Sequence, residues 1–175
     1  MGKTPRILIF TGDGKGKTTA ALGMAFRAHG HGMAVSVVQF IKGDSSTGEL
    51  LAAHGLADFE ILQSGLGFVP PTDDPRFAAH RAAAQAALEK AAEKIAGGRS
   101  RLVVLDEACL AVALGLLEER QLIEAVAQAL PETCVVLTGR GATPGLIALA
   151  DTVTEMRPVK HALQAGRAAE KGVEW

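Results

Sequence analysis

The sequence predicts a three-layer α/β sandwich with a mostly parallel sheet, folded as one domain over residues 1–175. Segments with strand and helix patterns alternate along the whole chain. The expected strands are short, continuous apolar runs, which are typical of parallel strands covered on both faces. A glycine-rich segment follows the first of these runs directly. At 175 residues the chain is long enough to bury a core of its own.

Six strands and four helices are expected. The strands are residues 7–10, 34–40, 58–62, 101–105, 133–137 and 152–156. The helices are residues 17 to about 28, residues 75–97 with Asp74 as the cap, residues 122–130 ended by Pro131, and one opened by Thr143 and Pro144. Ligands of such sheets bind beyond the carboxyl ends of the strands, so the loops after the strands are where the site is expected.

Composition excludes several classes of protein. A formal net charge of −1 argues against a dedicated nucleic-acid binder, which would carry a basic face. No apolar stretch reaches the length of a membrane span. Cys109 and Cys134, with no signal peptide before them, indicate reduced thiols in a cytoplasmic protein. The five histidines form no metal-ligand spacing with either cysteine, so no zinc site is expected.

Residues 11–19, Thr-Gly-Asp-Gly-Lys-Gly-Lys-Thr-Thr, have the composition of a phosphate-binding loop of the P-loop NTPase (RecA-like) fold. Glycines let successive backbone N–H groups surround an anion, and the following helix presents its N-terminal dipole. Lys17 is expected to reach the outer phosphates of ATP, and the Thr18 hydroxyl to bind Mg²⁺. Thr11 replaces the first glycine of the usual pattern. The residues expected to bind ATP phosphates are Gly12, Asp13, Gly14, Lys15, Gly16, Lys17, Thr18 and Thr19.

An acidic pair, Asp106 and Glu107, follows the apolar run 101–105. In P-loop proteins a carboxylate at this place holds Mg²⁺ (or Mn²⁺), directly or through water. The alternative is a helix cap at Asp106. Spacing alone does not decide which of the two carboxylates touches the metal.

Three further loops carry candidate residues. Lys42 and Arg140 are candidates for contacts to phosphate or substrate, and the alternative for both is a solvated surface side chain. Residues 63–71 form a long glycine- and proline-rich connection, and such loops tend to be functional. Phe68 in this loop is either a wall of a substrate site or a satellite core residue. No loop supplies an obvious general base, which suits chemistry driven by positioning and by stabilisation of a leaving group.

Taken in order, these segments resemble the P-loop-type ATP:corrinoid adenosyltransferases, which act on cob(I)yrinic acid a,c-diamide or cob(I)alamin. The resemblance covers nearly the full chain. The residues that carry it are Gly12–Ala21, Val38–Gly43, Leu105–Glu107, Thr138–Gly141, Ala150–Asp151, Glu155–His161 and the tail from Ala165 to Trp175.

The resemblance implies an enzyme that transfers the adenosyl group of ATP to a Co(I) corrinoid and releases triphosphate. It implies catalytic roles for Lys17 and Phe68, with Thr18 and Glu107 on Mg²⁺ and Asp106 behind them. It also implies a flavoprotein reductant and a homodimer. The family loop usually reads Gly-Phe-Thr-Trp; here Phe68 is kept, Pro70 stands in place of the tryptophan, and the only tryptophan is Trp175.

Two other classes of function stay open at this point. One is a P-loop ATPase or small-molecule kinase, which would give ADP as its product. The other is a non-catalytic protein that binds ATP and a corrinoid without transfer. The chain also begins close to its first strand, whereas many members of the family carry an N-terminal segment that helps to cover the site.

Overall fold

The computed structural model describes residues 4–162 and 166–173, and it has one six-stranded sheet in which every pairing is parallel. Trp175 and the end of the family-like tail lie outside the described residues. The strand order is β3-β2-β4-β5-β1-β6. The strands are β1 (Arg6–Thr11), β2 (Val35–Gln39), β3 (Phe59–Gln63), β4 (Leu102–Asp106), β5 (Cys134–Thr138) and β6 (Thr152–Glu155). The expected α/β sandwich with a parallel sheet is confirmed.

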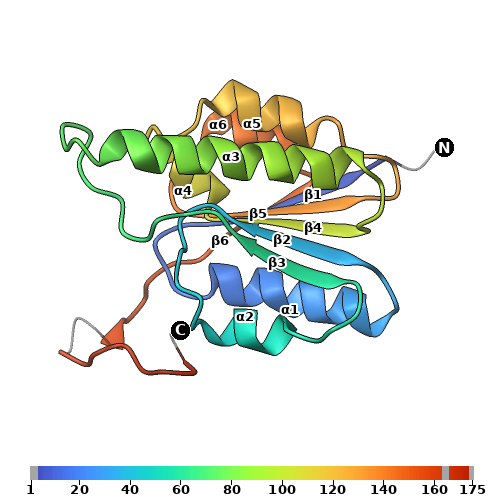
Figure 1. The fold of residues 1–175 in the computed structure, drawn as a ribbon, viewed down its shortest axis with the longest axis horizontal. Helices are drawn as coiled ribbons and strands as arrows, with labels where there is room; N and C mark the ends of the chain where they lie inside the picture. The colour runs from blue at the N-terminus through green and yellow to red at the C-terminus, as the bar shows by residue number, and fades with distance from the viewer. Residues whose placement is uncertain (1–3, 163–165, 174–175) are drawn as a thin grey trace.

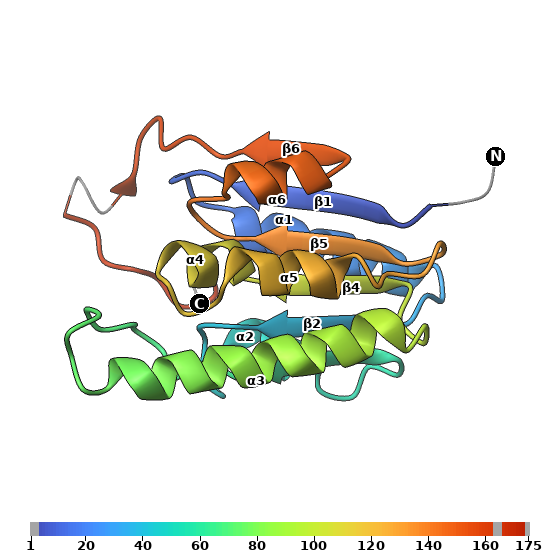
Figure 2. The ribbon, with the colours of Figure 1, turned by 90° about the horizontal axis from the view of Figure 1, so that it is seen from above.

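Helices cover both faces of the sheet, as Figure 1 shows. One face carries α1 and α2, and the other carries α3, α4, α5 and α6 (Figures 1 and 2). The helices are α1 (Lys17–Gly30), α2 (Gly48–Ala53), α3 (Phe77–Ala96), α4 (Ala108–Ala113), α5 (Glu119–Val126) and α6 (Pro144–Leu149). Within the described residues, none of the helices is long and apolar enough to cross a membrane.

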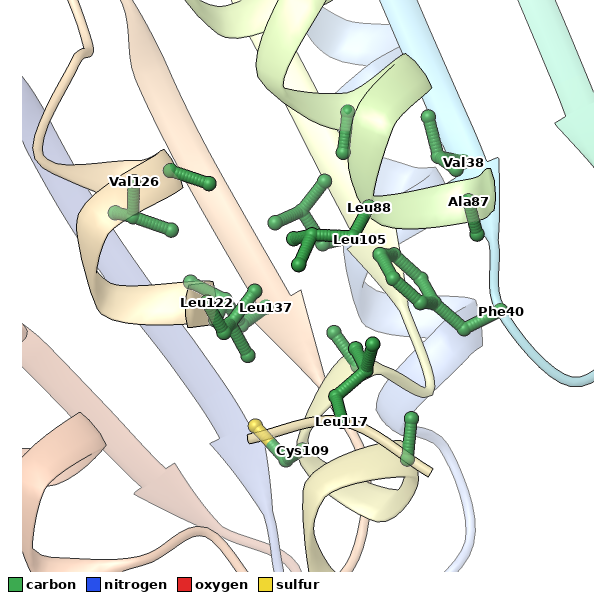
Figure 3. Packing of buried hydrophobic residues seen from close by; sticks show 14 of the residues in the cluster. Val38, Phe40, Ala87, Leu88, Leu105, Cys109, Leu117, Leu122, Val126 and Leu137 are labelled. Atoms are coloured by element: carbon green, nitrogen blue, oxygen red, sulfur yellow. The ribbon is translucent and has the colours of Figure 1, made fainter. Parts of the chain in front are cut away.

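Alternate residues of each strand feed two separate cores. In β1, Ile9 packs toward α3 and α5, whereas Leu8 packs on the α1 side. Figure 3 shows the larger core, where Phe40, Leu88 and Leu105 meet between the sheet and α3. These side chains are at most 5% exposed, and burying one of this size contributes about 2 kcal/mol. The buried strands therefore read as continuous apolar runs because both faces are covered.

Helix boundaries were predicted less well than strands. The helix expected at residue 75 begins at Phe77, because Asp74 does not cap a helix. Its carboxylate instead accepts hydrogen bonds from the Arg76 backbone N–H and guanidinium in a preceding turn. The helix expected over 122–130 is α5, which starts and ends earlier at Glu119 and Val126. The two six-residue helices α2 and α4 were not expected.

Because the sheet is parallel, the carboxyl ends of its strands all lie at one edge. β1 and β4 are separated only by β5, so the loop after Thr11 and the acidic pair after Leu105 face each other. In Figure 2 the segment between β3 and α3 and the chain after β6 extend from this same edge. The fold thus gathers the loop residues that the sequence singled out.

Candidate active site

The phosphate loop runs from the end of β1 to the start of α1. Gly12 and Gly16 adopt positive φ angles of 89° and 109°, a region that only glycine enters without strain. Gly16 directly precedes α1, so the free N–H groups of the first helical turn open into the loop. The loop is therefore built as the sequence predicted, with Thr11 as the last residue of the strand rather than a loop glycine.

Lys17 is held inside this loop. Its side chain is 7% exposed, and Nζ donates hydrogen bonds of 2.7 Å to the carbonyl oxygens of Gly12 and Gly14. Burial lowers the pKa of Lys17, whereas the neighbouring Glu107 carboxylate works in the opposite direction and Arg140 adds to the lowering. The Lys17 ammonium is thus fixed by the loop carbonyls and lies near both the negative Glu107 and the positive Arg140.

A backbone segment after β6 packs onto the phosphate loop, which sequence analysis missed. The Gly14 N–H donates to the Met156 carbonyl oxygen at 2.6 Å, and the Met156 N–H donates to the Thr11 carbonyl oxygen at 2.8 Å. A Cβ at Gly12 or Gly14 would lie 2.5 or 2.6 Å from the Met156 oxygen. These two glycines are therefore required by a neighbouring main chain as well as by any phosphate.

Asp106 is fully buried at the end of β4 and organises the polar side of the site. Its Oδ1 accepts hydrogen bonds from the hydroxyls of Thr18 (2.7 Å) and Thr138 (2.8 Å). Its Oδ2 accepts from Nε2 of Gln39 at 3.1 Å. A buried carboxylate with three donors is well satisfied, which explains how an ionisable group is tolerated there.

Glu107 differs from Asp106 in having an oxygen without a partner. Its backbone is left-handed, with φ of 62°, and its N–H donates to the Thr138 hydroxyl at 2.9 Å. Within the described residues, Oε2 is buried and accepts no hydrogen bond. Burial, and then the Asp106 carboxylate, raise the pKa of Glu107.

The donor set suits a Mg²⁺ ion that shares its ligands with a nucleotide. An orphaned buried carboxylate oxygen on Glu107 and the hydroxyl of Thr18 are both oxygen ligands of the kind Mg²⁺ takes, alongside phosphates and water. Across residues 4–162 and 166–173, no cluster of three or more His, Cys, Asp or Glu side chains could hold a metal by itself. The residues at this edge thus fit a magnesium–phosphate complex.

A cleft of about 340 Å³ opens at the phosphate loop. It is lined by Asp13, Gly14, Lys15, Gly16, Lys17, Thr18, Leu22, Lys42, Glu49, Glu107, Arg140 and His161. The fold thus brings most of the expected phosphate contacts together with Lys42, Arg140 and Glu107. Gly12, Thr19, Asp106 and Phe68 are not part of the lining.

Two titratable residues in the cleft, Glu49 and His161, were not among the expected site residues. Glu49 lies in α2, the short helix that was read as a loop, and its Oε1 accepts from Lys42 Nζ at 2.5 Å. Burial by itself raises the pKa of Glu49, but hydrogen bonds, chiefly from Lys42, outweigh it and lower the pKa. His161 follows β6 in the segment that packs on the phosphate loop. Lys42 and Glu49 therefore form an ion pair at the wall of the cleft, where the sequence predicted a polar loop.

Phe68 lies outside the cleft lining and is 92% exposed. The base of its loop is fixed by main-chain bonds, from the Gly65 N–H to the Lys42 carbonyl and from the Gly67 N–H to the Ile41 carbonyl. Phe68 is therefore not a core residue. It is an aromatic side chain presented to solvent from a tethered loop.

Comparison with known proteins gives the family. The family model described as ATP:corrinoid adenosyltransferase BtuR/CobO/CobP matches residues 3–175. A Pseudomonas aeruginosa protein named corrinoid adenosyltransferase is 45% identical over 172 residues, covering 97% of this chain and 83% of that protein. The Escherichia coli (strain K12) protein of the same name is 40% identical over 171 residues, covering 97% and 85%. The Salmonella typhimurium corrinoid adenosyltransferase CobA is 42% identical over 171 residues, with the same coverage.

Among solved structures, the flagellar accessory protein FlaH from Methanocaldococcus jannaschii is similar in fold, with a TM-score of 0.58. It is 11% identical, and the match covers 89% of this chain and 72% of that one, so the likeness concerns the fold alone. The family match has a different weight, because it runs through the phosphate loop, the acidic pair and the segment after β6. This chain belongs to the ATP:corrinoid adenosyltransferase family.

Proposed function

We propose that this protein transfers the 5′-deoxyadenosyl group of ATP to the Co(I) centre of a corrinoid and releases triphosphate, in the biosynthesis or salvage of adenosylcobalamin. The observation that carries the proposal is the family match over residues 3–175, which includes every segment around the cleft. The named relatives at 40–45% identity are corrinoid adenosyltransferases.

The reaction needs little acid–base chemistry from the protein. The electron pair of Co(I) forms the bond to the 5′ carbon, and the bond from that carbon to the triphosphate oxygen breaks with its electron pair on the oxygen. Cobalt passes formally from Co(I) to Co(III), and triphosphate is the leaving group. The nucleophile belongs to the substrate, so the protein's task is to position two substrates and to stabilise the leaving charge.

The phosphate loop supplies that stabilisation. The Gly14 N–H already donates to the Met156 carbonyl oxygen, so the donors to the triphosphate are the other backbone N–H groups between Gly12 and Thr19, at the N-terminus of α1. Lys17 adds a buried positive charge where negative charge develops, and such a charge acts more strongly there than in water. Lys42 and Arg140, which line the same cleft, are further cations for the triphosphate or the substrate.

A Mg²⁺ ion bound at this edge would neutralise phosphate charge as the triphosphate departs. The side chains that would hold it are Thr18 and Glu107. Asp106 orients Thr18 by accepting its hydroxyl hydrogen. The unpaired Oε2 of Glu107 supports a direct role for Glu107, with Asp106 behind.

The acceptor half of the site is assigned to Phe68, whose exposed ring is available to lie against the flat corrin. We propose that a homodimer partner helps to cover this half, because Pro70 stands where the family has an aromatic residue. A flavoprotein is proposed as the electron donor that generates Co(I). A cytoplasmic location is proposed as well, because ATP and such a strong reductant are both available there.

An anaerobic absorbance assay tests the proposal. The protein is mixed with chemically reduced Co(I) cobalamin, Mg²⁺ and ATP, and the phosphate product is identified by ion-exchange chromatography. The light-sensitive adenosyl–cobalt spectrum together with triphosphate is the expected result. ADP without a spectral change would move the chain to the ATPase or kinase class. Binding of both substrates without any product would make it a non-catalytic binding protein.

A further inference from the structure

Gln39, to which the proposed function gives no role, lies at the centre of a row of polar side chains. It is the last residue of β2, and the sheet register pairs it with Asp106 of β4 on one side and with Gln63 of β3 on the other. Gln39 and Asp106 are both 0% exposed. Three neighbouring strands thus end in the adjacent side chains of Gln63, Gln39 and Asp106, at the edge of the sheet where the cleft opens.

The hydrogen bonds of Gln39 fix its amide in one orientation. Nε2 donates to Asp106 Oδ2 at 3.1 Å and to Glu49 Oε1 at 3.2 Å. Oε1 accepts from Gln63 Nε2 at 2.9 Å. Turning the amide over would place its oxygen against two carboxylates and its NH₂ group against another amide NH₂ group, which the donors and acceptors forbid.

Gln39 also determines how the Asp106 carboxylate is turned. Oδ1 serves the Thr18 and Thr138 hydroxyls, and Gln39 is the near donor to Oδ2. The ammonium of Lys42 lies 4.0 Å from Oδ2. Without the Gln39 amide, the carboxylate gains by rotating toward Lys42, and that rotation draws Oδ1 away from the Thr18 hydroxyl.

We propose that Gln39 is a positioning residue for the magnesium–nucleotide site and that Gln63 locks it. Gln39 holds Asp106, Asp106 holds Thr18, and Gln63 holds Gln39 from the strand that leads into the Phe68 loop. Gln63 Nε2 is itself fixed by a second bond, to Thr47 Oγ1 at 3.2 Å. The inference rests on the nucleotide half of the proposed function and not on the corrinoid.

The test measures the binding of an ATP analogue, the β,γ-imido compound, by calorimetry with and without Mg²⁺. The quantity of interest is the dissociation constant without Mg²⁺ divided by the dissociation constant with Mg²⁺, which measures how much the metal strengthens binding. Gln39→Met keeps the length of the side chain and removes its hydrogen bonds, and it is expected to reduce this ratio about tenfold, the usual effect of one hydrogen bond to a charged group. Gln63→Met is expected to reduce the ratio about threefold, since it removes a bond between neutral groups.

The double variant tests whether Gln63 acts through Gln39. If Gln63 acts only through Gln39, the double variant has the same ratio as the Gln39→Met single variant. Ser36→Ala is the matched control, because Ser36 is a buried, hydrogen-bonded residue of the same strand at its far end. It is expected to lower thermal stability without moving the ratio, which separates a structural effect from a positioning effect.

An unchanged ratio in Gln39→Met overturns the inference, as does a full additional loss from Gln63→Met in the double variant. If Gln39→Met does not fold, the variant of the half-buried Gln63 provides the test. An unchanged ratio in Gln63→Met overturns the proposal that Gln63 fixes Gln39. A wild-type protein that binds the analogue with Mg²⁺ but transfers no adenosyl group overturns the proposed reaction alone. Absence of any Mg²⁺ effect in the wild type overturns the inference together with the magnesium site on Thr18 and Glu107, and leaves adenosyl transfer to be decided by the absorbance assay.

Discussion

The two halves of the site differ in how firmly the fold holds them. On the nucleotide side, Lys17 is 7% exposed and Asp106 is 0% exposed, and each makes two or more hydrogen bonds. On the acceptor side, the Phe68 ring is 92% exposed, although its loop is tethered at its base and the neighbouring Val69 packs against the core. One half is complete before any substrate arrives, and the other presents an apolar ring to water.

This difference has a physical reason. Triphosphate is a strongly hydrated anion, and donors fixed in advance stabilise it without reorganising during the reaction. A corrin is a large, flat and partly apolar partner, and burying an exposed ring against it gains free energy only when it binds. The charged half therefore gains from rigidity, whereas the apolar half can be completed by the substrate itself.

Removing the charge in the rigid half should have the largest effect. Lys17→Ala is expected to lower the rate of adenosyl transfer about a thousandfold, because a buried cation on the leaving group is lost. The loss should be the same with chemically reduced Co(I) and with Co(II) under a weak reductant, measured by the appearance of the adenosyl–cobalt spectrum. Lys94→Ala, which removes a lysine paired with Glu60 away from the cleft, is the control. Near-normal turnover of Lys17→Ala would contradict the role given to this lysine.

A pair of glycines tests how tightly the rigid half is packed. Gly14→Ala places a Cβ 2.6 Å from the Met156 carbonyl oxygen, and we expect it to destabilise the fold by about 2 kcal/mol. Gly23→Ala in α1 meets nothing within 4 Å and should stabilise the protein by about 0.5–1 kcal/mol. Urea unfolding of both variants gives the comparison. Equal stability of the two variants would mean that the segment after β6 yields easily and that the loop is not held by it.

The acceptor half should respond in kinetics and not in stability. Phe68→Ala is expected to slow transfer to Co(II) under a weak reductant about tenfold, the loss of one ring contact, and to slow chemically prepared Co(I) far less. Its free energy of unfolding should stay within about 0.5 kcal/mol of the wild type, because the ring is exposed. Phe26→Ala, which removes a ring packed on Phe59, should lower stability and leave the ratio of the two rates unchanged. Equal slowing of both reactions by Phe68→Ala would contradict a specific role of the ring in the reaction that starts from Co(II).

Glu107 gives the smallest expected effect, on stability as a function of pH. The folded state raises the pKa of Glu107, so it binds this proton more tightly than the unfolded chain does. The cost of the ionised carboxylate is absent at low pH and grows as pH rises through and above the ordinary glutamate pKa. Glu107→Gln should therefore raise the free energy of unfolding by about 1 kcal/mol near neutral pH and by nothing below about pH 4.

Glu49 supplies the control of opposite sign. Hydrogen bonds lower its pKa, so Glu49→Gln should cost stability near neutral pH and cost nothing at low pH. Unfolding in urea at the two pH values measures both variants without Mg²⁺ or nucleotide. If Glu107→Gln destabilises the protein near neutral pH, the carboxylate has a partner and is not held ready for a metal.

Local pattern determined much of this protein. Each of the six strands lies within a residue or two of its expected position, because a parallel strand covered on both faces must be a continuous apolar run. The loop before Lys17 could be read directly, since its glycines and its lysine have few other uses at a strand–helix junction. Family membership followed from the order of such segments.

Tertiary structure decided what depends on contacts between distant residues. The helices α2 and α4 are too short to form without packing, so no local signal marks them, and Glu49 was placed in a loop. Met156 meets Gly14 and Gln39 meets Asp106 only because β6 pairs with β1 and β2 pairs with β4. The strand order depends on the packing of the whole sheet, so spacing along the chain shows which groups can do the chemistry, and only the fold shows which of them touch.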